Sequence, residues 1–504
     1  MEAELSSLVR DARAAARTMA ALGAAERDAA LLAVRTSLND ARDVIEACNR
    51  EDKLDAKRCN LPDTLLKRLD VEGAKFDAML SKVDEVRAQT DPVGEVGAAT
   101  ELDTGLRLYR VACPIGVICV IFESRPEAAV QIAALTLRTA NAVILKGGKE
   151  AAATNGALVA AMQGGLGASG VIPPSAVQLV SSRDQISQLL KMHGQIDLIV
   201  PRGSNALVSH IMQSTSIPVL GHADGICALY IDESAAPAVA TRVAVDSKTD
   251  YPVACNAAET LLLHRATLGG SGVTGGKGGK GGKGGAGLWP QLGAALLAAG
   301  VELRADDESF AALAAHQPGA VAEAKLLRAQ PSDFATEFGA KILAVKVVEN
   351  VGDAAAHINA HGSHHTDCIV ATDDAAVEYF MRHVDSAGVY ANASTRFADG
   401  ARYGFGAEVG VSTNRIHSRG PVGVQGLLIY KYKLYGGGHI AAEYSSGARS
   451  FKHAPLPLTD HPKRGGGGGG GGSARWMALL GLAAAATAAG AVVLRQRGGA
   501  VRLW

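Results

Sequence analysis

The chain has 504 residues, with 50 basic and 50 acidic side chains and therefore no formal net charge. This length allows two or three domains with large cores, and the charge balance excludes a strong electrostatic preference for nucleic acid or for an acidic partner. The seven cysteines are widely spread and form no Cys-x-x-Cys pair. They argue against a disulfide framework or a structural zinc site, and they favour a reducing compartment.

The first hundred residues predict helices. Residues 3–50 are rich in Ala, with Leu and charged residues at helical spacing, which predicts two helices that break near Asn39-Asp40. Asp63 could cap a further helix. Acidic residues mixed with arginines in the first turns favour a folded helix over a targeting peptide. Residues 105–112 alternate apolar and polar side chains, which predicts an exposed or edge strand.

The next stretch alternates strands and helices. Residues 117–122 and 142–145 are apolar runs that predict buried strands, and Pro126 opens a helix between them. A strand, a helix and a second strand in succession form a βαβ unit, which predicts a parallel sheet. The alternation continues through a strand over 196–200. We therefore predict a doubly wound α/β domain, in which ligands bind at the carboxyl ends of the strands.

The dinucleotide fingerprint Gly-x-Gly-x-x-Gly is missing from these turns. It does occur at residues 276–281, inside a Gly-Gly-Lys repeat that follows no strand and opens no helix, so the match carries no information. Residues 269–287 are predicted to be a flexible surface insertion. Helices are expected over 288–330, a Gly-rich loop over 403–426, and strands over 341–348, 368–371, 389–391 and 427–434.

Residues 246–264, DSKTDYPVACNAAETLLLH, place Cys255 in a short polar turn. The apolar run after this turn predicts a buried strand. A cysteine held on such a turn is typical of a thiolate nucleophile. The alternative is a small cysteine buried in the core.

Several long segments, in the right order, resemble the gamma-glutamyl phosphate reductases of the aldehyde dehydrogenase superfamily. The segments are PIGVICVIFESRPEAAVQIAALTLRTANAVILKGGKEA, DLIVPRGSNALV, DSKTDYPVACNAAETLLLH, HINAHGSHHTDCIVA and VDSAGVYANASTRFADGARYGFGAEVGVSTNRIHSRGPVG. The resemblance runs from about residue 5 to about residue 445, with the glycine insertion as an interruption. Asp250-Tyr251-Pro252 is similar to the reductase half of delta-1-pyrroline-5-carboxylate synthase, whose kinase half has no counterpart here.

The resemblance implies an aldehyde dehydrogenase-like α/β fold with two doubly wound parallel-sheet domains and a small β oligomerisation arm. The expected divisions are an NADP-binding domain over 1–226, with an arm strand near 100–112, and a catalytic domain over 227–422. Oligomerisation strands are expected over 423–445. The arm strands would pair between subunits, so a homo-oligomer is expected.

A reaction is also implied. Cys255 would attack L-glutamyl 5-phosphate and expel phosphate, and the resulting thioester would take hydride from NADPH to give L-glutamate 5-semialdehyde for proline biosynthesis. The oxyanion requires preorganised donors. The backbone N–H of Cys255 is one candidate, and the second donor is left open between Asn256 and Ser124. Where hydrolytic relatives carry a Glu that activates water, this chain has Val219, which cannot do so and therefore favours reduction.

The cofactor site follows by position. Lys146 resembles the lysine that contacts the adenosine ribose. Lys149 stands where NAD-selective relatives carry Glu, and a cation there would attract a 2′-phosphate, so NADPH is expected. Gly203 and Ser204 at a helix start would hold the pyrophosphate. Glu337 resembles the Glu that binds the nicotinamide ribose; the alternative is an ordinary exposed carboxylate.

Substrate-binding residues are implied as well. Arg396 of NASTRF could pair with the α-carboxylate of the substrate, and the alternative is a structural salt bridge. Asn392, Ser394 and Phe397 would lie at the same active-site mouth. Lys248 could contact the phosphate, or it could simply be solvated.

No metal ligands are predicted. His361, His364 and His365 could bind a metal, but their spacing is not a recognised metal-ligand spacing and the family needs no metal. An anion contact or a hydrogen bond within the loop is preferred for these histidines.

The C-terminal tail combines a linker with an apolar segment. Residues 446–474, which include eight consecutive glycines at 465–472, predict a flexible linker. Residues 475–495 are just long enough to span a bilayer core of about 30 Å. They predict a tail anchor in an organelle outer membrane, with a cytoplasmic catalytic domain. The alternative is an Ala-rich helix that binds nothing.

The leading hypothesis is therefore an NADP-dependent, phosphorylating glutamate-5-semialdehyde dehydrogenase. One alternative is a semialdehyde dehydrogenase of the same superfamily that acts on a different acyl group. A second alternative is a membrane-tethered, catalytically silent relative that binds a partner such as glutamate 5-kinase.

Overall fold

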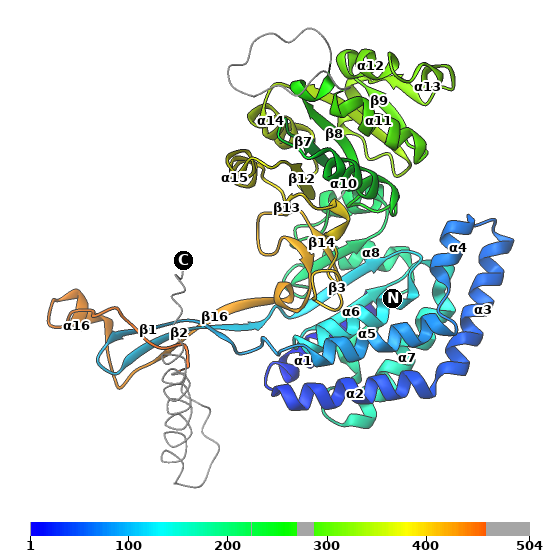
Figure 1. Ribbon diagram of the computed structural model, residues 1–504. Helices are drawn as coiled ribbons and strands as arrows, with labels where there is room; N and C mark the ends of the chain where they lie inside the picture. The colour runs from blue at the N-terminus through cyan, green and yellow to red at the C-terminus, as the bar shows by residue number, and fades with distance from the viewer. Residues whose placement is uncertain (1, 223, 270–286, 460–504) are drawn as a thin grey trace, which may run out of the picture.

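A computed structural model describes residues 2–222, 224–269 and 287–459, and the structural statements below concern these residues. Two parallel sheets form two domains, and a long antiparallel β arm projects from the first domain (Figure 1). The helices are α1 Glu2–Met19, α2 Ala24–Asp40, α3 Arg42–Arg58, α4 Asp63–Leu69, α5 Ala74–Ala88, α6 Pro126–Arg138, α7 Ala152–Ser169, α8 Arg183–Leu189, α9 Asn205–Ser214, α10 Pro237–Thr249, α11 Leu288–Ala298, α12 Asp307–Ala314, α13 Pro318–Ala322, α14 Val351–His361, α15 Asp374–His383 and α16 Ala441–Ser445.

The strands fall into four sheets. Their bounds are β1 Val96–Asp103, β2 Leu106–Pro114, β3 Val117–Phe122, β4 Ala142–Lys146, β5 Val177–Leu179, β6 Leu198–Arg202, β7 Cys227–Ile231, β8 Ala258–His264, β9 Glu302–Ala305, β10 Leu326–Arg328, β11 Ile342–Val348, β12 Thr366–Val370, β13 Gly388–Ala391, β14 Gly410–Ser412, β15 Gly420–Val422, β16 Leu428–Tyr435 and β17 Ala454–Pro455.

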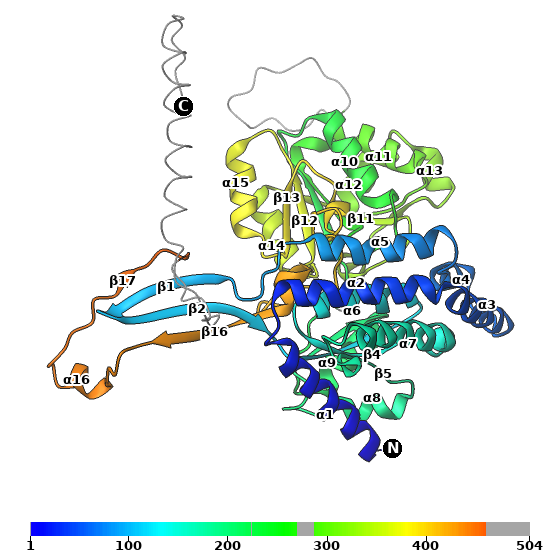
Figure 2. The ribbon, with the colours of Figure 1, turned by 90° about the horizontal axis from the view of Figure 1, so that it is seen from below.

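The first domain confirms the predicted βαβ pattern. Its four parallel strands lie in the order β5-β4-β3-β6. Every residue of β3 is buried, because helices cover this central strand and leave it no solvent-facing side. The α1, α2, α5, α6 and α7 helices contribute apolar side chains to the same core (Figure 2).

The N-terminal helices differ from the prediction in number. Residues 3–50 hold α1, α2 and most of α3, so there are three helices rather than two. The predicted break near Asn39-Asp40 is confirmed, because α2 ends at Asp40. The missed break lies at Gly23, which caps α2 while Glu26 accepts its backbone N–H at 2.7 Å. Gly at an N-cap is a weak sequence signal inside an Ala-rich run.

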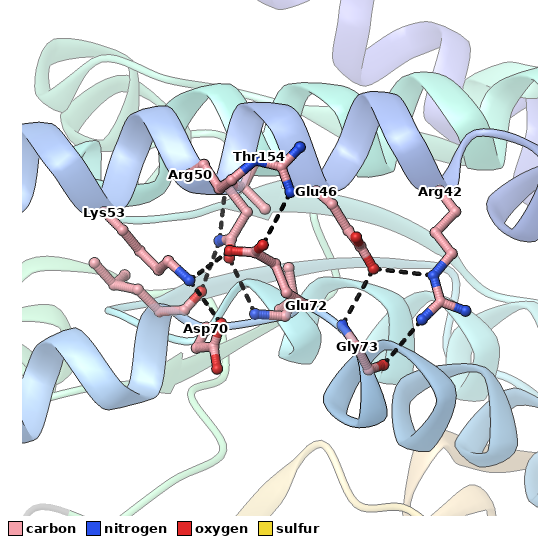
Figure 3. Close-up of polar contacts among 11 residues, drawn as sticks. Arg42, Glu46, Arg50, Lys53, Asp70, Glu72, Gly73 and Thr154 are labelled. Atoms are coloured by element: carbon pink, nitrogen blue, oxygen red, sulfur yellow. Dashed lines mark hydrogen bonds and ion pairs between the residues drawn. The ribbon is translucent and has the colours of Figure 1, made fainter.

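Ion pairs hold α3 to the chain between α4 and α5 (Figure 3). Glu72 accepts from Lys53 at 2.5 Å and from Arg50 at 3.0 Å. Lys53 also donates to Asp70 at 2.8 Å. These side chains are partly exposed, so the network orients α4 and α5 more than it stabilises them.

The second domain contains a seven-stranded parallel sheet in the order β10-β9-β11-β8-β7-β12-β13. The expected strands over 341–348, 368–371 and 389–391 correspond to β11, β12 and β13. The prediction of helices throughout 288–330 is wrong in part, because the short strands β9 and β10 extend the sheet at one edge.

The chain returns to the first domain near residue 407. Ala407, Val409 and Val422 are buried in the core of the first domain, although the sequence predicted a Gly-rich loop over 403–426 and a catalytic domain up to residue 422. The hairpin formed by β14 and β15 lies in this segment. The predicted division at residue 422 therefore does not follow the packing.

The arm is an antiparallel sheet in the order β16-β2-β1-β17. The predicted strand over 105–112 corresponds to β2, which lies between two neighbours and is not an edge strand. Residues 454–455 form β17 and pair with β1, so the linker predicted over 446–474 begins later than expected. β16 is an edge strand that exposes Ile429 and Tyr432, as a subunit contact would require, and pairing between subunits remains a prediction.

None of the helices described here has the length and apolar character needed to cross a bilayer. The predicted anchor over 475–495 and the glycine run over 465–472 lie outside the described residues. Residues 270–286 of the predicted insertion lie outside them too.

Candidate active site

The candidate site lies where the two domains present opposite edges of their sheets. Cys255 precedes β8, His365 precedes β12, and Glu337 lies in the loop before β11. Since β11, β8, β7 and β12 are neighbours in one parallel sheet, these residues gather at its amino edge. At the carboxyl edge of the first sheet, where the sequence predicts the cofactor, Lys146 ends β4 and Ser204 follows β6.

Cys255 contacts a histidine. Its Sγ lies 3.3 Å from Nε2 of His365, which is 1% exposed and whose Nδ1 lies 2.9 Å from Oγ1 of Thr366. The ring of His222 packs edge-on against His365, with centroids 4.9 Å apart. This arrangement gives the thiol a direct acceptor for its proton.

His222 has a fixed tautomer. Its Nδ1 donates to the carbonyl oxygen of Val411 at 3.0 Å, because a carbonyl can only accept, and Nε2 therefore keeps a lone pair when the ring is neutral. Burial lowers the pKa of His222, and nearby Arg202 lowers it further, so the ring is neutral at neutral pH. His222 is thus an uncharged base beside the nucleophile.

Backbone packing positions the nucleophile turn. A Cβ at Gly225 would lie 2.2 Å from the carbonyl oxygen of Cys255 and 2.4 Å from its Cα, so only glycine permits this approach. Within the described part of the chain, the backbone N–H groups of Cys255 and Asn256 make no hydrogen bond, while those of Ala254 and Ala257 do. These two free donors are oxyanion-hole candidates.

The two side chains proposed as second oxyanion donors are occupied. The Asn256 amide donates to the carbonyl of Ala398 at 2.9 Å. Oγ and the backbone N–H of Ser124 both donate to Oε1 of Glu150, at 2.8 and 2.7 Å. The backbone N–H of Asn256 is therefore better placed for the role than either side chain.

Lys248 lies beneath the nucleophile turn rather than at its surface. Its Nζ donates to Glu259 at 2.5 Å, and both side chains are 0% exposed. Burial raises the pKa of Glu259 to about 7 and lowers the pKa of Lys248. The solvated alternative is wrong, and this ammonium is paired with a carboxylate rather than open to a phosphate. The charge of Glu337 acts on both residues and on His222, which places it near the nucleophile.

The predicted cofactor residues follow the strands of the first sheet. Lys146 ends β4, and Lys149 is exposed just beyond it without an ion pair to any described residue. Ser204 precedes α9, and its backbone N–H donates to a carboxylate oxygen of Glu123 at 3.0 Å. Gly203 lies against the same carboxylate, since a Cβ there would be 2.6 Å from that oxygen. The carboxylate of Glu123 therefore already occupies the N-terminus of α9.

Arg396 forms the salt bridge that the sequence left as the alternative. Its Nε donates to Asp250 at 3.2 Å, and Arg402 donates to the same oxygen at 3.2 Å. The hydrogen bond from Arg402, followed by the charge of Arg396, lowers the pKa of Asp250. The two arginines join the NASTRF segment to the nucleophile turn, so the Arg396 guanidinium is partly occupied.

The remaining predicted residues of the mouth have structural contacts. Ser394 accepts from the backbone N–H of Arg396 at 3.3 Å and caps a short turn of 3-10 helix. Asn392 exchanges two hydrogen bonds with the backbone of Ala371. Phe397 is 55% exposed and is free to contact a ligand.

The three clustered histidines of the sequence separate in space. The His361 ring packs against His357, and Nδ1 of His364 bonds to the carbonyl of Asp385 at 2.7 Å. His365 alone reaches Cys255. Within the described ranges, one group of His, Cys, Asp or Glu side chains lies close enough together to share a metal ion. It consists of His222, Cys255 and His365, whose ligand atoms lie within 4.8 Å of one another.

Sequence reasoning missed the roles of His222 and His365. The sequence predicted an anion contact or a loop hydrogen bond for His365, and His222 was not singled out. Their approach to Cys255 depends on the order of β7, β8 and β12 in the sheet. The local signal that could have identified His365 is its position as a polar residue directly before the buried strand β12.

Known proteins resemble this chain over most of its length. The aldehyde dehydrogenase family model matches residues 1–268. A probable gamma-glutamyl phosphate reductase of Schizosaccharomyces pombe is 44% identical over 460 residues, which cover 90% of this chain and 97% of the relative. The gamma-glutamyl phosphate reductase of Synechococcus sp. WH7803 is 46% identical over 457 residues, which cover 90% and 98%.

Solved structures agree. The crystal structure of gamma-glutamyl phosphate reductase from Thermotoga maritima has a TM-score of 0.79 at 32% identity, covering 87% of this chain and 99% of that one. An acetylating aldehyde dehydrogenase from Geobacillus thermoglucosidasius shares the fold, with a TM-score of 0.57 at 18% identity. The chain therefore belongs to the aldehyde dehydrogenase family and, within it, to the gamma-glutamyl phosphate reductases.

Proposed function

We propose that this protein reduces L-glutamyl 5-phosphate to L-glutamate 5-semialdehyde and phosphate in proline biosynthesis, with NADPH as the hydride donor. The observation that carries the proposal is the contact between Cys255 and His365 at the amino edge of the second sheet, in a chain that belongs to this family. An acyl phosphate needs a nucleophile for its carbonyl carbon and donors for the oxyanion, and both are available in the nucleophile turn.

The chain's own residues perform the acyl transfer. His365 takes the proton of the Cys255 thiol through Nε2, and the thiolate attacks the carbonyl carbon of the substrate. The N–H groups of Cys255 and Asn256 stabilise the oxyanion, which collapses to a thioester as phosphate leaves. After hydride addition, the second oxyanion collapses, releases the aldehyde and regenerates the thiolate.

NADPH would supply the hydride, and the carboxyl edge of the first sheet fits such a cofactor. Lys149 offers an exposed cation suited to a 2′-phosphate, and the start of α9 offers N–H groups suited to a pyrophosphate. Glu123 now bonds to Ser204 and would turn away to admit this group. Lys146 and Glu337 are the proposed ribose contacts.

Water is the competitor of hydride for the thioester. The presence of Val219 alone does not exclude hydrolysis, because His222 is a neutral base beside the nucleophile. We propose that His222 instead orders the His365 ring. The observation that favours this role is its tight edge-on packing against that ring.

The test is the reverse reaction, the oxidation of glutamate semialdehyde supplied as pyrroline-5-carboxylate. The expected result is phosphate-dependent reduction of NADP⁺, with NAD⁺ a poorer acceptor. Turnover without phosphate would mean that water resolves the thioester, and the proposal would fail in favour of a hydrolytic dehydrogenase. The absence of turnover with both acceptors would favour the silent, partner-binding relative.

The tail anchor, the homo-oligomer and an association with glutamate kinase are proposals of the same kind. The apolar composition of 475–495 supports the anchor, and the exposed face of β16 supports pairing between subunits. Deletion of 465–504 should release a membrane-bound pool without changing turnover. Full-length protein that is never membrane-associated would exclude the anchor.

A further inference from the structure

A pocket of about 250 Å³ lies between α4, α5 and the start of α6. Its lining combines several cations with two partly buried carboxyl groups, Asp70 and Glu127. Lys75 and Lys82 in this lining are already paired with Asp70 and Glu85. Exposed Lys67, partly buried Arg68 and Glu127 are left without an ion pair to a described residue, and α4 and α6 bring them to the same pocket.

Glu127 has an unused oxygen. Its Oε2 is fully buried and has no hydrogen-bond partner among the described residues. Burial raises the pKa of Glu127, and a hydrogen bond from its own backbone N–H and the charges of Arg125, Lys75 and Arg202 act against this rise. A buried carboxylate oxygen without a donor costs free energy, and a ligand that donates a hydrogen bond removes that cost.

Arg125 and Arg68 are the matching cations. In the part of the chain that the structure describes, neither side chain makes a hydrogen bond or an ion pair, and their mutual repulsion is one reason that the pKa of the mostly buried Arg125 is lowered, after burial and Arg202. Arg125 and Glu127 are only two residues apart, yet their side chains do not bond to each other. Arg125 is not part of the pocket lining, but its charge acts on Glu127. A cation within electrostatic reach of an unpaired carboxylate suits a ligand that carries both charges on one carbon.

The pocket adjoins the nucleophile turn. Tyr251, four residues before Cys255, acts electrostatically on Arg125. Its ring also lies 5.9 Å from the guanidinium of Arg396. α5 lies along the interface between the domains, where Lys82 reaches the carbonyl of Gly406 at 3.4 Å (Figure 2). Tyr251 thus connects Arg125 with the nucleophile turn, and Lys82 connects the pocket lining with the segment that returns from the second domain.

We propose that Glu127 binds the α-ammonium group of the substrate and that Arg125, with Arg68, binds its α-carboxylate. The inference rests on the proposed function, because glutamyl 5-phosphate carries these two groups on one carbon. It gives the α-carboxylate a partner other than Arg396, which is paired with Asp250. Discrimination for an amino acid over a plain dicarboxylic analogue would then reside in Glu127.

The test compares three aldehydes in the phosphate-dependent reverse reaction: glutamate semialdehyde, 5-oxopentanoate, which lacks the amine, and 4-aminobutanal, which lacks the carboxylate. Glu127→Gln should raise KM for glutamate semialdehyde at least about tenfold and leave 5-oxopentanoate within about twofold. Arg125→Ala should raise KM for both carboxylates at least about tenfold and spare 4-aminobutanal. The amino aldehydes cyclise in solution to the same extent with every protein, so the ratio of the KM of a variant to the KM of the wild type is not affected by this cyclisation.

Matched controls lie on α15, where Glu378 and Arg382 are exposed. Glu378→Gln and Arg382→Ala should leave all three KM values unchanged. Equal losses on glutamate semialdehyde and 5-oxopentanoate in Glu127→Gln would overturn the proposal and make Glu127 a structural residue. If Arg125→Ala does not fold, Arg125→Lys keeps the charge, loses the planar fork and should show a smaller shift in the same direction.

A binding measurement separates this proposal from the proposed function. L-Glutamate has both charged groups but no reactive carbonyl carbon, and it can be titrated calorimetrically into the full-length protein. It should bind the wild type and bind Glu127→Gln at least about tenfold more weakly, while glutarate should bind both equally. Equal binding of L-glutamate to both proteins, or none to either, would refute the subsite. Inactivity of the wild type on every aldehyde would refute only the proposed function.

Discussion

Replacement of His365 by Gln tests the pairing on which the reaction depends. The His365→Gln variant would keep a polar side chain of similar reach, but its amide could not take the Cys255 proton. The contact measures 3.3 Å and joins a half-buried thiol to a buried imidazole. A hydrogen bond to a charged group is worth about 1.5–3 kcal/mol, which is about a 10- to 150-fold change in the rate of a step that depends on it. The rate of Cys255 alkylation should fall by that factor.

The assay is labelling with iodoacetamide, followed at each cysteine by mass spectrometry. Exposed Cys59 is an internal reference whose rate should not change. His364→Gln is the matched control, because His364 is adjacent in sequence but bonds to the carbonyl of Asp385. If Cys255 were alkylated equally fast in His365→Gln and wild type while turnover fell, His365 would not activate the thiol and the reasoning would be refuted.

Three further perturbations follow from the packing. Gly225→Ala should displace Cys255 and reduce turnover about 100-fold or more without unfolding the protein. Gly156→Ala is the control and should be neutral, because a Cβ at this position meets nothing within 4 Å. Equal turnover of the two variants would refute the role of Gly225. Glu259→Gln should lower the melting temperature, because an unpaired buried Lys248 costs about 3–5 kcal/mol, and a double replacement of the pair by apolar residues should restore it. Burial, followed by repulsion from neighbouring cations, lowers the pKa of His357 to about 4. Between about pH 6.5 and 4, His357 is therefore protonated in the unfolded chain but neutral in the folded chain, so lowering the pH favours unfolding. The melting temperature of the wild type should fall as the pH is lowered through this range. The melting temperature of His357→Gln should fall less steeply.

The elements that the sequence predicted well are those with long apolar runs. β3, β4 and β8 are fully or almost fully buried strands, and their composition alone identifies them. β9, β10 and β17 have at most four residues. Strands this short form because a neighbour supplies a ladder of hydrogen bonds, and that neighbour is distant in the sequence.

The site divides in the same way. Cys255 could be found from its own turn, because a local pattern presents it. His365, Gly225 and Glu127 could not, because their roles depend on which strand ends and helices lie next to each other. Arg396 was found but is committed to Asp250, since the sequence does not disclose which carboxylate lies within reach.

The placement of the site follows from the path of the chain. A rule that puts ligands at the carboxyl ends of parallel strands accounts for Ser204 after β6, but the nucleophile lies at the amino edge of the other sheet. The two edges must therefore face each other for hydride and thioester to meet. The segment from Ala407 to Leu427 returns from the second domain and packs into the core of the first. Its Val411 carbonyl fixes His222 beside Cys255, so this returning segment couples the packing of one domain to the chemistry of the other.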